Sequence, residues 1–447
     1  MKQVVSGYLD IPEDRILEFD HHSAHAAAAY YGSPYNKKDA LVLTIDGEGD
    51  LLSSTVRTVK NEVWKVIART EADASLGYIY MDVTGYLGMK RNEHEYKVMG
   101  LAPYAKEANV LPLYEKIKSM YTCNRKTLTF SSQFDTHMTQ YYLKKHLAGQ
   151  RFDIIAGAFQ KLVEDNVVSW VAACVHKTKL RTVCMGGGVI MNVKANMKVS
   201  QISSVEELFP CPSASDESTA IGGCYLGYIS SCKIHAQEPK PESLGPLYLG
   251  PSFSNKDVKE FLQQGRYFQK YTISFHKNIE KVIARHIAQN HIVARMSGRM
   301  EWGARALGNR SILANPSNPD LVRVINEQMK MRDFWMPFTP SILEERSEDY
   351  IVNPKHIIAP YMIMTFDSTD LGKKHLKAVM HPYDFTLRPQ IVGYTWNPSY
   401  YTIIKEFEKM TGIGAVLNTS FNLHGMPVVL GPKEAMQYSC METLYNF

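Results

Sequence analysis

Residues 40–50 have the sequence ALVLTIDGEGD, and this stretch indicates the fold of the first half of the chain. Its apolar run ends in Asp46 and Gly47, which predicts a buried strand with a loop at its carboxyl end. Residues 153–178 have helical periodicity, and residues 181–189, RTVCMGGGV, predict a strand that leads into a glycine turn. Because helices alternate with buried strands, we expect an α/β domain here.

The second half of the chain predicts another α/β or α+β unit. Residues 233–256, KIHAQEPKPESLGPLYLGPSFSNK, are rich in proline, glycine and serine, which favours a linker. Residues 279–311 then predict a helix, a strand and a basic loop. Further strands are expected in four apolar stretches: HIVARM (291–296), APYMIMTF (359–366), PQIVGYT (389–395) and GAVLNTS (414–420).

Length and composition narrow the class of protein. A chain of 447 residues is too long for one compact core, so two domains are expected. The net charge of +5 is no signature of nucleic-acid binding, although it suits small anionic substrates. No apolar stretch approaches the roughly 18–20 residues that cross a bilayer, and the start lacks the apolar segment of a signal peptide. The seven cysteines form no CxxC pair, which favours a reduced, cytoplasmic protein.

A pair of histidines forms the first candidate site, in DHHSAHAAAAYYGSPY (20–35). On a helix, His21 and His25 share one face with Cβ atoms about 5–6 Å apart, so two imidazoles can hold one divalent ion. The alanines that follow favour a helix. The metalloprotease motif HExxH is excluded, because His22 stands where that motif needs glutamate. The alternative is a helix end that carries surface histidines.

Two aspartates extend this candidate site. Asp46 ends a buried strand, and ligand sites gather at the carboxyl ends of strands in open α/β sheets. Asp216, in CPSASDEST (211–219), stands at a predicted helix start, where an N-cap role alone would explain it. Two histidines and two aspartates would suit zinc or ferrous iron.

A glycine loop follows in MGGGVIMNVKAN, residues 185–196. Three glycines between a predicted strand and a predicted helix can present backbone N–H groups to an anion. The loop matches neither the GxGxxG pattern nor the Walker pattern, so no dinucleotide or P-loop site is predicted. A tight structural turn is the alternative.

The second half contains basic segments suited to phosphate. Guanidinium groups bind phosphate oxygens in bidentate fashion, and apolar neighbours indicate a half-buried segment that needs an anionic partner. A solvated charged face is the alternative. The cations, in GRMEWGARALGNRSIL (298–313) and in residues 325–342, are Arg299, Arg305, Arg310, Lys330 and Arg332.

Three further polar residues come later in the chain. Arg388 lies in the sequence LRPQ, and Ser420 and Asn422 add hydroxyl and amide groups at the end of a buried strand. The alternatives are an ion-pair network within the protein for Arg388 and turn chemistry for Ser420 and Asn422.

Together these stretches resemble one family, the O-carbamoyltransferases of antibiotic and nodulation-factor biosynthesis. Each matching stretch is modest alone, but their order and number, from about residue 19 to about residue 430, make the match specific. The matching stretches are DHHSAHAAAAYYGSPY, LTIDGEGD, EYKVMGLAPYAK (95–106), MGGGVIMNVKAN, GRMEWGARALGNRSIL and LNTSFNLHGMPVV.

The resemblance implies an α/β chain of two domains. Residues 1–240 would form an actin/Hsp70-like carbamoyl-transfer domain, related to the threonylcarbamoyl-tRNA transferase. Residues 241–275 would be a linker, and residues 276–447 a YrdC-like domain. Most of the family open with a glycine-bearing strand and then His-Asp before small residues, and nothing of this kind precedes residue 19. The resemblance therefore predicts an N-terminally truncated actin-like domain that lacks its first strands.

The resemblance also implies the chemistry. In such enzymes the YrdC-like domain joins carbamoyl phosphate to ATP, which gives carbamoyl-adenylate and pyrophosphate, with Mg²⁺ at the triphosphate. The first domain then passes the carbamoyl group to an acceptor hydroxyl beside iron or zinc. The implied metal ligands are His21, His25, Asp46 and Asp216. The implied adenylate-forming residues are Arg305, Lys330, Arg388 and Ser420, with Asn422 adjacent. The implied adenylate-holding residues of the first domain are Gly186, Gly187, Gly188 and Asn192.

We therefore expect an ATP-dependent, metal-containing O-carbamoyltransferase that acts on a hydroxyl of a small natural product or sugar. Two alternatives stay open. One is threonylcarbamoyl transfer to tRNA adenosine, although the near-neutral charge and the lack of a basic arm argue against it. The other is a non-catalytic nucleotide-binding protein. No nucleic-acid or membrane partner is expected.

Overall fold

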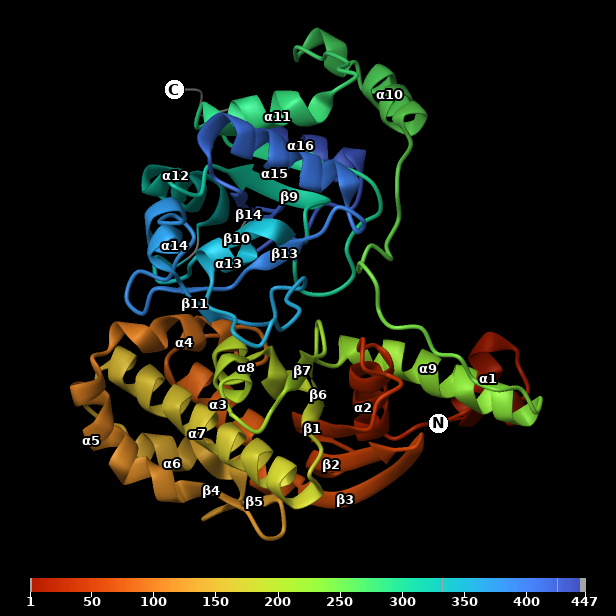
Figure 1. Cartoon of the computed structure of the whole chain (residues 1–447), viewed down its shortest axis with the longest axis vertical. Helices are drawn as coiled ribbons and strands as arrows, with labels where there is room; N and C mark the ends of the chain where they lie inside the picture. Colours follow the sequence, from red (N-terminus) through yellow and green to blue (C-terminus); the bar gives the residue numbers. More distant parts are fainter. Residues whose placement is uncertain (1, 332, 424, 443–447) are drawn as a thin grey trace.

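A five-stranded mixed sheet organises the first half of the chain (Figure 1). The computed structural model describes residues 2–331, 333–423 and 425–442, with the backbone alone for residues 439–442. The strands are β1 Ala40–Gly49, β2 Leu52–Lys60, β3 Val63–Glu71, β6 Thr182–Gly186 and β7 Glu207–Pro210. Their order is β3-β2-β1-β6-β7, with β1 antiparallel to β2 and parallel to β6. The predicted strands at 40–46 and 181–189 are confirmed.

The central strand β1 changes its course at Asp46. Its first six residues are fully buried and pair regularly with β2, from Ala40 opposite Val59 to Ile45 opposite Ser54. The register then shifts before Gly49, as in a β-bulge, which re-aims side chains. Asp46 therefore lies within the strand, at the bulge, and at the same edge of the sheet as the end of β6.

Helices cover both faces of this sheet, which explains why residues 40–45 of β1 are apolar apart from Thr44. In Figure 1, α2 and α9 lie on one side of the sheet, and α3 and α7 lie on the other. The predicted helix at 153–178 is confirmed as α7. The helices of this half are α1 Lys2–Leu9, α2 His21–Tyr31, α3 Leu76–Tyr86, α4 Glu95–Leu101, α5 Glu107–Ile117, α6 Thr139–His146, α7 Phe152–Thr178, α8 Val193–Ser200 and α9 Glu217–Ile234. A small hairpin joins β4 Tyr121–Asn124 and β5 Thr129–Ser132.

Helices α2 and α9 approach each other closely at Gly222. A Cβ atom at this glycine would lie 1.8 Å from the carbonyl oxygen of Ala24, so no larger residue fits without moving a helix. At the next residue, Gly223, a Cβ atom would meet nothing within 4 Å.

We expect Gly222→Ala to lower the free energy of unfolding by about 1–3 kcal/mol through overpacking. Gly223→Ala is the matched control, because it adds the same methyl group to the same helix without a clash. Alanine is a better helix former than glycine by about 1 kcal/mol, so this variant should be as stable as the parent or slightly more stable. Urea denaturation followed by circular dichroism measures both. Equal stability of the two variants would contradict the close packing.

A second five-stranded sheet organises the other half, in the upper part of Figure 1. Its order is β13-β10-β14-β9-β8, and only β10 and β13 pair parallel. The strands are β8 Val293–Met296, β9 Arg310–Ala314, β10 Thr339–Leu343, β13 Gln390–Val392 and β14 Ala415–Ser420. The short strands β11 Phe366–Asp367 and β12 Thr386–Leu387 pair separately. The helices are α10 Asn255–Gln264, α11 Ile279–Ala288, α12 Pro319–Ile325, α13 Ser347–Tyr350, α14 Asp370–His375, α15 Pro398–Thr411 and α16 Pro432–Glu442.

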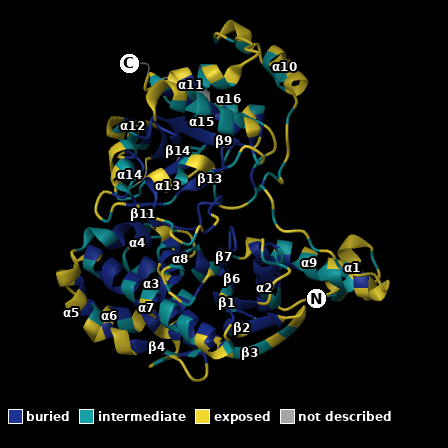
Figure 2. Cartoon of the chain, viewed as in Figure 1, coloured by how far each residue is buried: buried dark blue, intermediate teal, exposed yellow. Residues whose placement is uncertain are grey.

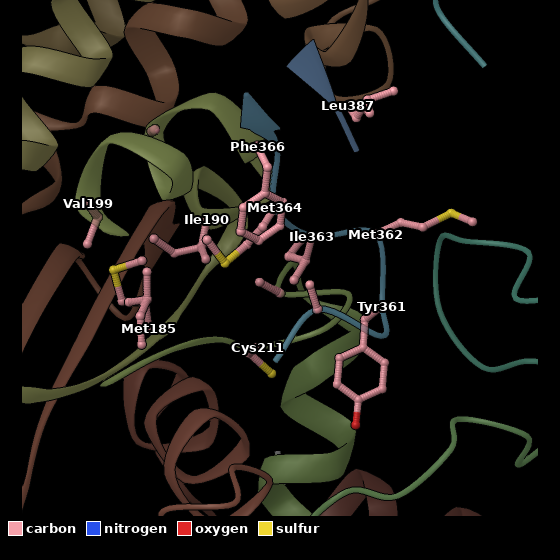
Figure 3. Close-up of a cluster of buried hydrophobic side chains, with 14 of the residues drawn as sticks. Met185, Ile190, Val199, Cys211, Tyr361, Met362, Ile363, Met364, Phe366 and Leu387 are labelled. Carbon is pink, nitrogen blue, oxygen red and sulfur yellow. The ribbon is translucent and has the colours of Figure 1, made fainter. Parts of the chain in front are cut away.

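Three of the four strands expected in this half are confirmed as β8, β13 and β14. The prediction of a fourth strand at 359–366 is wrong, because only Phe366 of this stretch belongs to a strand. This segment runs irregularly between the two halves, and Figure 3 shows its side chains beside Met185 and Ile190 of the first half. Asn196 donates to the carbonyl oxygen of Ile363 (2.9 Å), so the buried backbone keeps a partner. A buried junction is as apolar as a buried strand, so sequence pattern does not separate the two.

The expected linker contains both an irregular segment and a helix. Residues 237–254 form neither helix nor strand, and α10 follows them. Arg299 fastens this segment to the second half by donating to the carbonyl oxygen of Gly250 (3.0 Å). In Figure 2, both sheets are largely buried, whereas α1 and α10 are largely exposed.

His381 forms a hydrogen bond between the two halves, and we expect protonation of its ring to weaken their packing. Its Nε2 donates to the carbonyl oxygen of Gly100 in α4 (3.0 Å), and the ring is buried. Burial lowers the pKa of His381, although the carboxylate of Asp384 opposes this effect and Lys194 adds to it. The ring is therefore neutral in the folded protein, whereas in the unfolded chain it titrates near about pH 6.5.

Acidification from about pH 7.5 to about pH 5.5 should therefore lower stability, since the unfolded chain gains the proton that folded His381 resists. In His381→Gln, which keeps an N–H donor, this loss should be smaller. His176→Gln, at an exposed histidine that forms no ion pair within the described part of the chain, is the control and should keep the parental pH dependence. Urea midpoints at the two pH values test this expectation, and an unchanged pH dependence in His381→Gln would contradict it.

Candidate active site

Helix α2 begins at the predicted histidine pair because Asp20 caps it. The Asp20 carboxylate accepts a hydrogen bond from the backbone N–H of Ser23 (2.8 Å), as an N-cap residue does. The alanines that follow pack, fully buried, against β1 and β6. His21 and His25 therefore point together from the first turns of α2 toward the bulge in β1.

The four predicted metal ligands converge. One donor atom from each of them lies within 4.8 Å of every other. The Nε2 atoms of His21 and His25 are 2.9 Å apart, and they lie 2.9 and 2.8 Å from Oδ2 of Asp46. Oδ1 of Asp216 lies 3.7 and 3.8 Å from the same two nitrogens. The surface-histidine alternative is wrong for His25, which is completely buried.

These distances fit a divalent cation. Zinc bonds of about 2.0–2.1 Å in a tetrahedral site place neighbouring donor atoms about 3.3 Å apart, and the observed separations bracket that value. The hydrogen bonds around His25 also favour a cation at this position. The Ser218 hydroxyl donates to the carbonyl oxygen of Ala214 (3.4 Å), so it accepts from Nδ1 of His25 (2.8 Å). In a neutral ring Nε2 then presents a lone pair to a carboxylate oxygen, and a cation between them removes that repulsion.

Asp46 is held in place by the backbone. Its Oδ1 accepts hydrogen bonds from the N–H groups of Gly47 (2.8 Å) and Gly188 (3.0 Å), which turns Oδ2 toward the histidines. Burial alone would raise the pKa of Asp46, but the hydrogen bonds from His21 and from the backbone N–H of Gly47 hold it well below its usual range. The same contact with Asp46 raises the pKa of His21.

Asp216 stands directly before α9 without serving as its cap. Its side chain makes no capping hydrogen bond and is 77% exposed, so the N-cap alternative does not describe its role. It forms the open side of the ligand group, next to solvent.

His22 belongs to the structure rather than to the ligand group. Its Nε2 donates to the carbonyl oxygen of Leu52 (3.0 Å), and its Nδ1 accepts from the hydroxyl of Thr44 (2.8 Å). Burial lowers its pKa, so the ring is neutral.

The glycine loop encloses the ligand group from the side of β6. Gly187 has a φ of +95°, and a Cβ atom there would lie 2.3 Å from the carbonyl oxygen of Ile45. A Cβ atom at Gly186 would lie 2.9 Å from the carbonyl oxygen of His25. The N–H of Gly187 donates to Ala214 (3.0 Å), and that of Gly188 to Asp46. The turn thus has the structural role that the sequence left open, and adenylate binding by this loop stays a prediction.

Asn192 follows the loop and caps α8. Its side chain accepts from the N–H of Ala195 (3.0 Å) and forms a reciprocal amide pair with Gln160, at 3.0 Å in each direction. Its assignment to adenylate binding likewise stays a prediction.

Three of the predicted adenylate-forming residues meet at the end of β14. Lys330 is buried, and its Nζ donates to the carbonyl (2.8 Å) and side-chain (2.7 Å) oxygens of Asn422. It also reaches the Ser420 hydroxyl (3.3 Å), which donates to the side-chain oxygen of Asn422 (2.6 Å). The cluster therefore places an ammonium, a hydroxyl and an amide at one edge of the second sheet.

Arg305 lies in a loop that bridges the two halves. The following residue, Ala306, accepts from the side chain of Asn418 in β14 (3.1 Å). The preceding one, Ala304, donates its N–H to the hydroxyl of Ser213 in the first half (3.0 Å). Nε of Arg305 is buried without a hydrogen-bond partner, and burial lowers its pKa although the charge of Glu217 opposes this.

The remaining cations fall into different groups. Arg310 is fully buried and donates to the carbonyl oxygens of Ser297 (3.0 Å) and Asn309 (2.9 Å), and Arg299 fastens the linker. Arg310 serves the fold, so its interpretation as a phosphate ligand is wrong. For Arg299, which is exposed, phosphate binding stays a prediction. Arg388 stands between β12 and β13, and Arg332 lies outside the described residues.

Sequence reasoning missed a second polar group beside the ligands. Glu48, two residues after Asp46, accepts from the hydroxyl of Tyr78 (2.8 Å) and lies 3.2 Å from Nε2 of His137. Nδ1 of His137 lies 2.6 Å from Asp135, and these two carboxylates raise the pKa of His137. The sequence DTH contains no spacing that points to β1, so only the fold reveals this contact.

Comparisons with known proteins assign the family. The family model described as Carbamoyltransferase N-terminus matches residues 8–225, and the one described as Carbamoyltransferase C-terminus matches residues 284–445. The chain belongs to the carbamoyltransferase family. It is therefore a carbamoyltransferase enzyme, and the resemblance found in the sequence is confirmed.

Individual relatives agree with this assignment. An uncharacterized protein of Methanocaldococcus jannaschii, MJ1058, is 33% identical over 94% of this chain and 70% of its own length. Nodulation protein NolO of Bradyrhizobium diazoefficiens is 30% identical over 93% of this chain and 75% of its own length. Among solved structures, full-length HypF in a phosphate- and nucleotide-bound form matches 51% of this chain and 44% of its own at 12% identity. Its TM-score of 0.30 is too low to establish a common fold. No described helix is long and apolar enough to cross a membrane.

Proposed function

We propose that this carbamoyltransferase activates carbamoyl phosphate with ATP and transfers the carbamoyl group to a hydroxyl of a small natural product or sugar. The observation that carries the proposal is the pairing of two clusters. One is the ligand group of His21, His25, Asp46 and Asp216, and the other is the polar cluster around Lys330. The hydrogen bond from Ala304 to Ser213 links the loop of the second half to the segment that precedes Asp216.

The first step takes place in the second half, which we assign to a YrdC-like domain over residues 276–447. Residues 1–240 would form the actin/Hsp70-like transfer domain, and residues 241–275 the linker. ATP and carbamoyl phosphate are multiply anionic, so their reaction needs fixed positive charge. Arg305, Lys330 and Arg388 supply it, together with Mg²⁺ at the triphosphate. Ser420 and Asn422 orient the reacting groups by hydrogen bonds. Water hydrolyses carbamoyl phosphate to carbamate and inorganic phosphate. An oxygen of carbamate then attacks the α-phosphorus of ATP, which releases pyrophosphate and leaves carbamoyl-adenylate.

The second step takes place in the first half, where the acceptor hydroxyl oxygen attacks the carbamoyl carbon of carbamoyl-adenylate and AMP leaves. A divalent cation, iron or zinc, held by the four ligands would polarise the carbamoyl carbonyl or lower the pKa of the acceptor hydroxyl. The loop of Gly186, Gly187 and Gly188, with Asn192, would hold the adenylate, and enclosure between the two halves limits its hydrolysis.

A cytoplasmic setting fits this chemistry. ATP and carbamoyl phosphate are intracellular metabolites in this scheme, and all six described cysteines are free. We propose that carbamoyl phosphate, ATP and a hydroxyl-bearing small molecule are the substrates and that no nucleic acid takes part.

Pyrophosphate release tests the first step directly. With ATP, Mg²⁺ and carbamoyl phosphate, the protein should release pyrophosphate, because the residues assigned to adenylation are all present. Acetyl phosphate in place of carbamoyl phosphate is the matched control, since it carries the same phosphate on a different acyl group, and it should give only background release. Background release with carbamoyl phosphate would contradict the proposal and favour a non-catalytic nucleotide-binding protein.

A further inference from the structure

A surface groove lies away from the ligand group around Asp46 and from the polar cluster around Lys330. It has a volume of about 1110 Å³ and runs between the turn of the β4–β5 hairpin and the second half of α7. In Figure 1, this hairpin lies at the end of the first half that is remote from the second half. No step of the carbamoyl transfer uses it.

Four cations line this groove without a counter-ion. They are Arg125 and Lys126 on the hairpin turn and Lys177 and Lys179 at the end of α7. Arg125 donates to the hydroxyl of Ser169 (2.9 Å), and Lys177 donates to the carbonyl oxygen of Lys126 (2.9 Å). None of the four forms an ion pair within the described part of the chain, whereas Lys90, Lys118 and Lys405 all do.

The acidic residue in the groove does not neutralise them. Asp165 accepts from the hydroxyl of Tyr114 (2.5 Å) and pairs with Lys161 (3.1 Å), so its charge is already balanced. The whole chain has a net charge of only +5. Four uncompensated cations in one groove therefore form a strong local positive potential.

The floor of the groove is apolar and made of small side chains. Val168, Ala172 and Ala173 line the groove from α7, and Ala172 and Ala173 stand four and five residues after Val168. Small side chains at a contact let a second helix approach closely. The groove follows residues 165–179, a helical length of about 21 Å.

We propose that this groove docks an acidic amphipathic helix of a partner protein. Its cations pair with a row of carboxylates, and its floor of small side chains takes an apolar stripe, which is the helix-in-groove mode of recognition. A small ligand fits less well, because ligand sites enclose most of the molecule and this one is open along α7. Single-stranded nucleic acid fits less well too, because His176 is the one ring among the described residues that line the groove, whereas such sites stack successive bases on several aromatic rings.

A synthetic helix tests the proposal. The probe is a fluorescent peptide of about 14 residues, the helical length of the groove, that carries a leucine stripe flanked by glutamates. Its binding is followed by fluorescence anisotropy at about 0.15 M salt. The full chain should bind it. Arg125→Glu combined with Lys177→Glu should weaken binding by about tenfold or more, because two attractions become repulsions. Lys373→Glu combined with Lys374→Glu, on exposed α14, makes the same change of charge elsewhere and should leave binding within about twofold.

A further peptide and a further variant distinguish docking of an amphipathic helix from nonspecific attraction of any polyanion. A peptide with serines in place of the leucines keeps the charge and should bind several-fold more weakly, because the floor loses its contact. A second variant, Lys126→Glu on the hairpin turn, should also weaken binding, and circular dichroism shows whether each variant is folded. Three results would overturn the proposal: no binding of the peptide, equal loss in both double variants, or tighter binding of a single-stranded RNA at the same salt.

Discussion

Replacing His25 with alanine is expected to leave the purified protein without stoichiometric metal. His25 is completely buried, and its Nε2 lies at the centre of the ligand group, 2.8 Å from Asp46 and 2.9 Å from His21. Loss of a partner that only orients a ligand already costs about 10–100-fold in metal affinity, so loss of the ligand itself should cost more. Elemental analysis of the purified protein and metal titration of the apoprotein measure the effect.

The control for this substitution is a second buried histidine. His381→Ala removes an imidazole that donates to the carbonyl oxygen of Gly100, outside the ligand group. It should lower stability but leave the metal content unchanged. The ligand assignment would be wrong if His25→Ala kept its metal, or if both variants lost it equally while both stayed folded.

The four converging side chains could be predicted from sequence because each stands at a recognisable place. His21 and His25 share a helix face, Asp46 ends an apolar run, and Asp216 stands at a helix start. Their grouping into one candidate site was predicted from these places, and the family resemblance implied the same four ligands. Ser218 and His137 escaped prediction, since their contacts with His25 and Glu48 join segments far apart in the chain.

The same limits explain the errors. Arg310 and Arg305 stand in one basic segment. The guanidinium of Arg310 donates to backbone carbonyl oxygens, whereas Nε of Arg305 is buried without a hydrogen-bond partner. Sequence pattern reports charge but not what neutralises or solvates it. The apolar run at 359–366 predicts a strand because it has the composition of a buried strand. Burial alone does not distinguish a strand within a sheet from an irregular segment between two domains. Tertiary contacts determine both the role of Arg310 and the irregular conformation of residues 359–365.

Replacing Lys330 with methionine is expected to remove pyrophosphate release. Nζ of Lys330 is the only charged group of the polar cluster at the end of β14, as far as the structure describes it, and it binds Asn422 at 2.7 and 2.8 Å. Methionine keeps most of the volume but removes the ammonium that would screen the triphosphate. Loss of one such electrostatic contact costs about 10²–10³-fold in rate. A coupled pyrophosphate assay with ATP and carbamoyl phosphate measures it.

A structural lysine provides the control for this variant. Lys355 donates to the carbonyl oxygens of Ile202 (2.6 Å) and Val205 (2.7 Å), so it also caps backbone oxygens but lies apart from the cluster. Lys355→Met should therefore cost stability and keep pyrophosphate release. If Lys330 acted only in the fold, its substitution would change the urea midpoint as Lys355→Met does and leave the rate intact.

The two substitutions should also separate the two steps from each other. Lys330→Met lies in the second half and should keep its metal, whereas His25→Ala lies in the first half and should keep pyrophosphate release. This reciprocal result follows from the geometry, because the two clusters share no residue and are linked through a loop contact from Ala304 to Ser213. A metal loss in Lys330→Met, or a loss of pyrophosphate release in His25→Ala, would mean that the halves do not act as separate sites. The assignment of one step to each sheet would then be wrong.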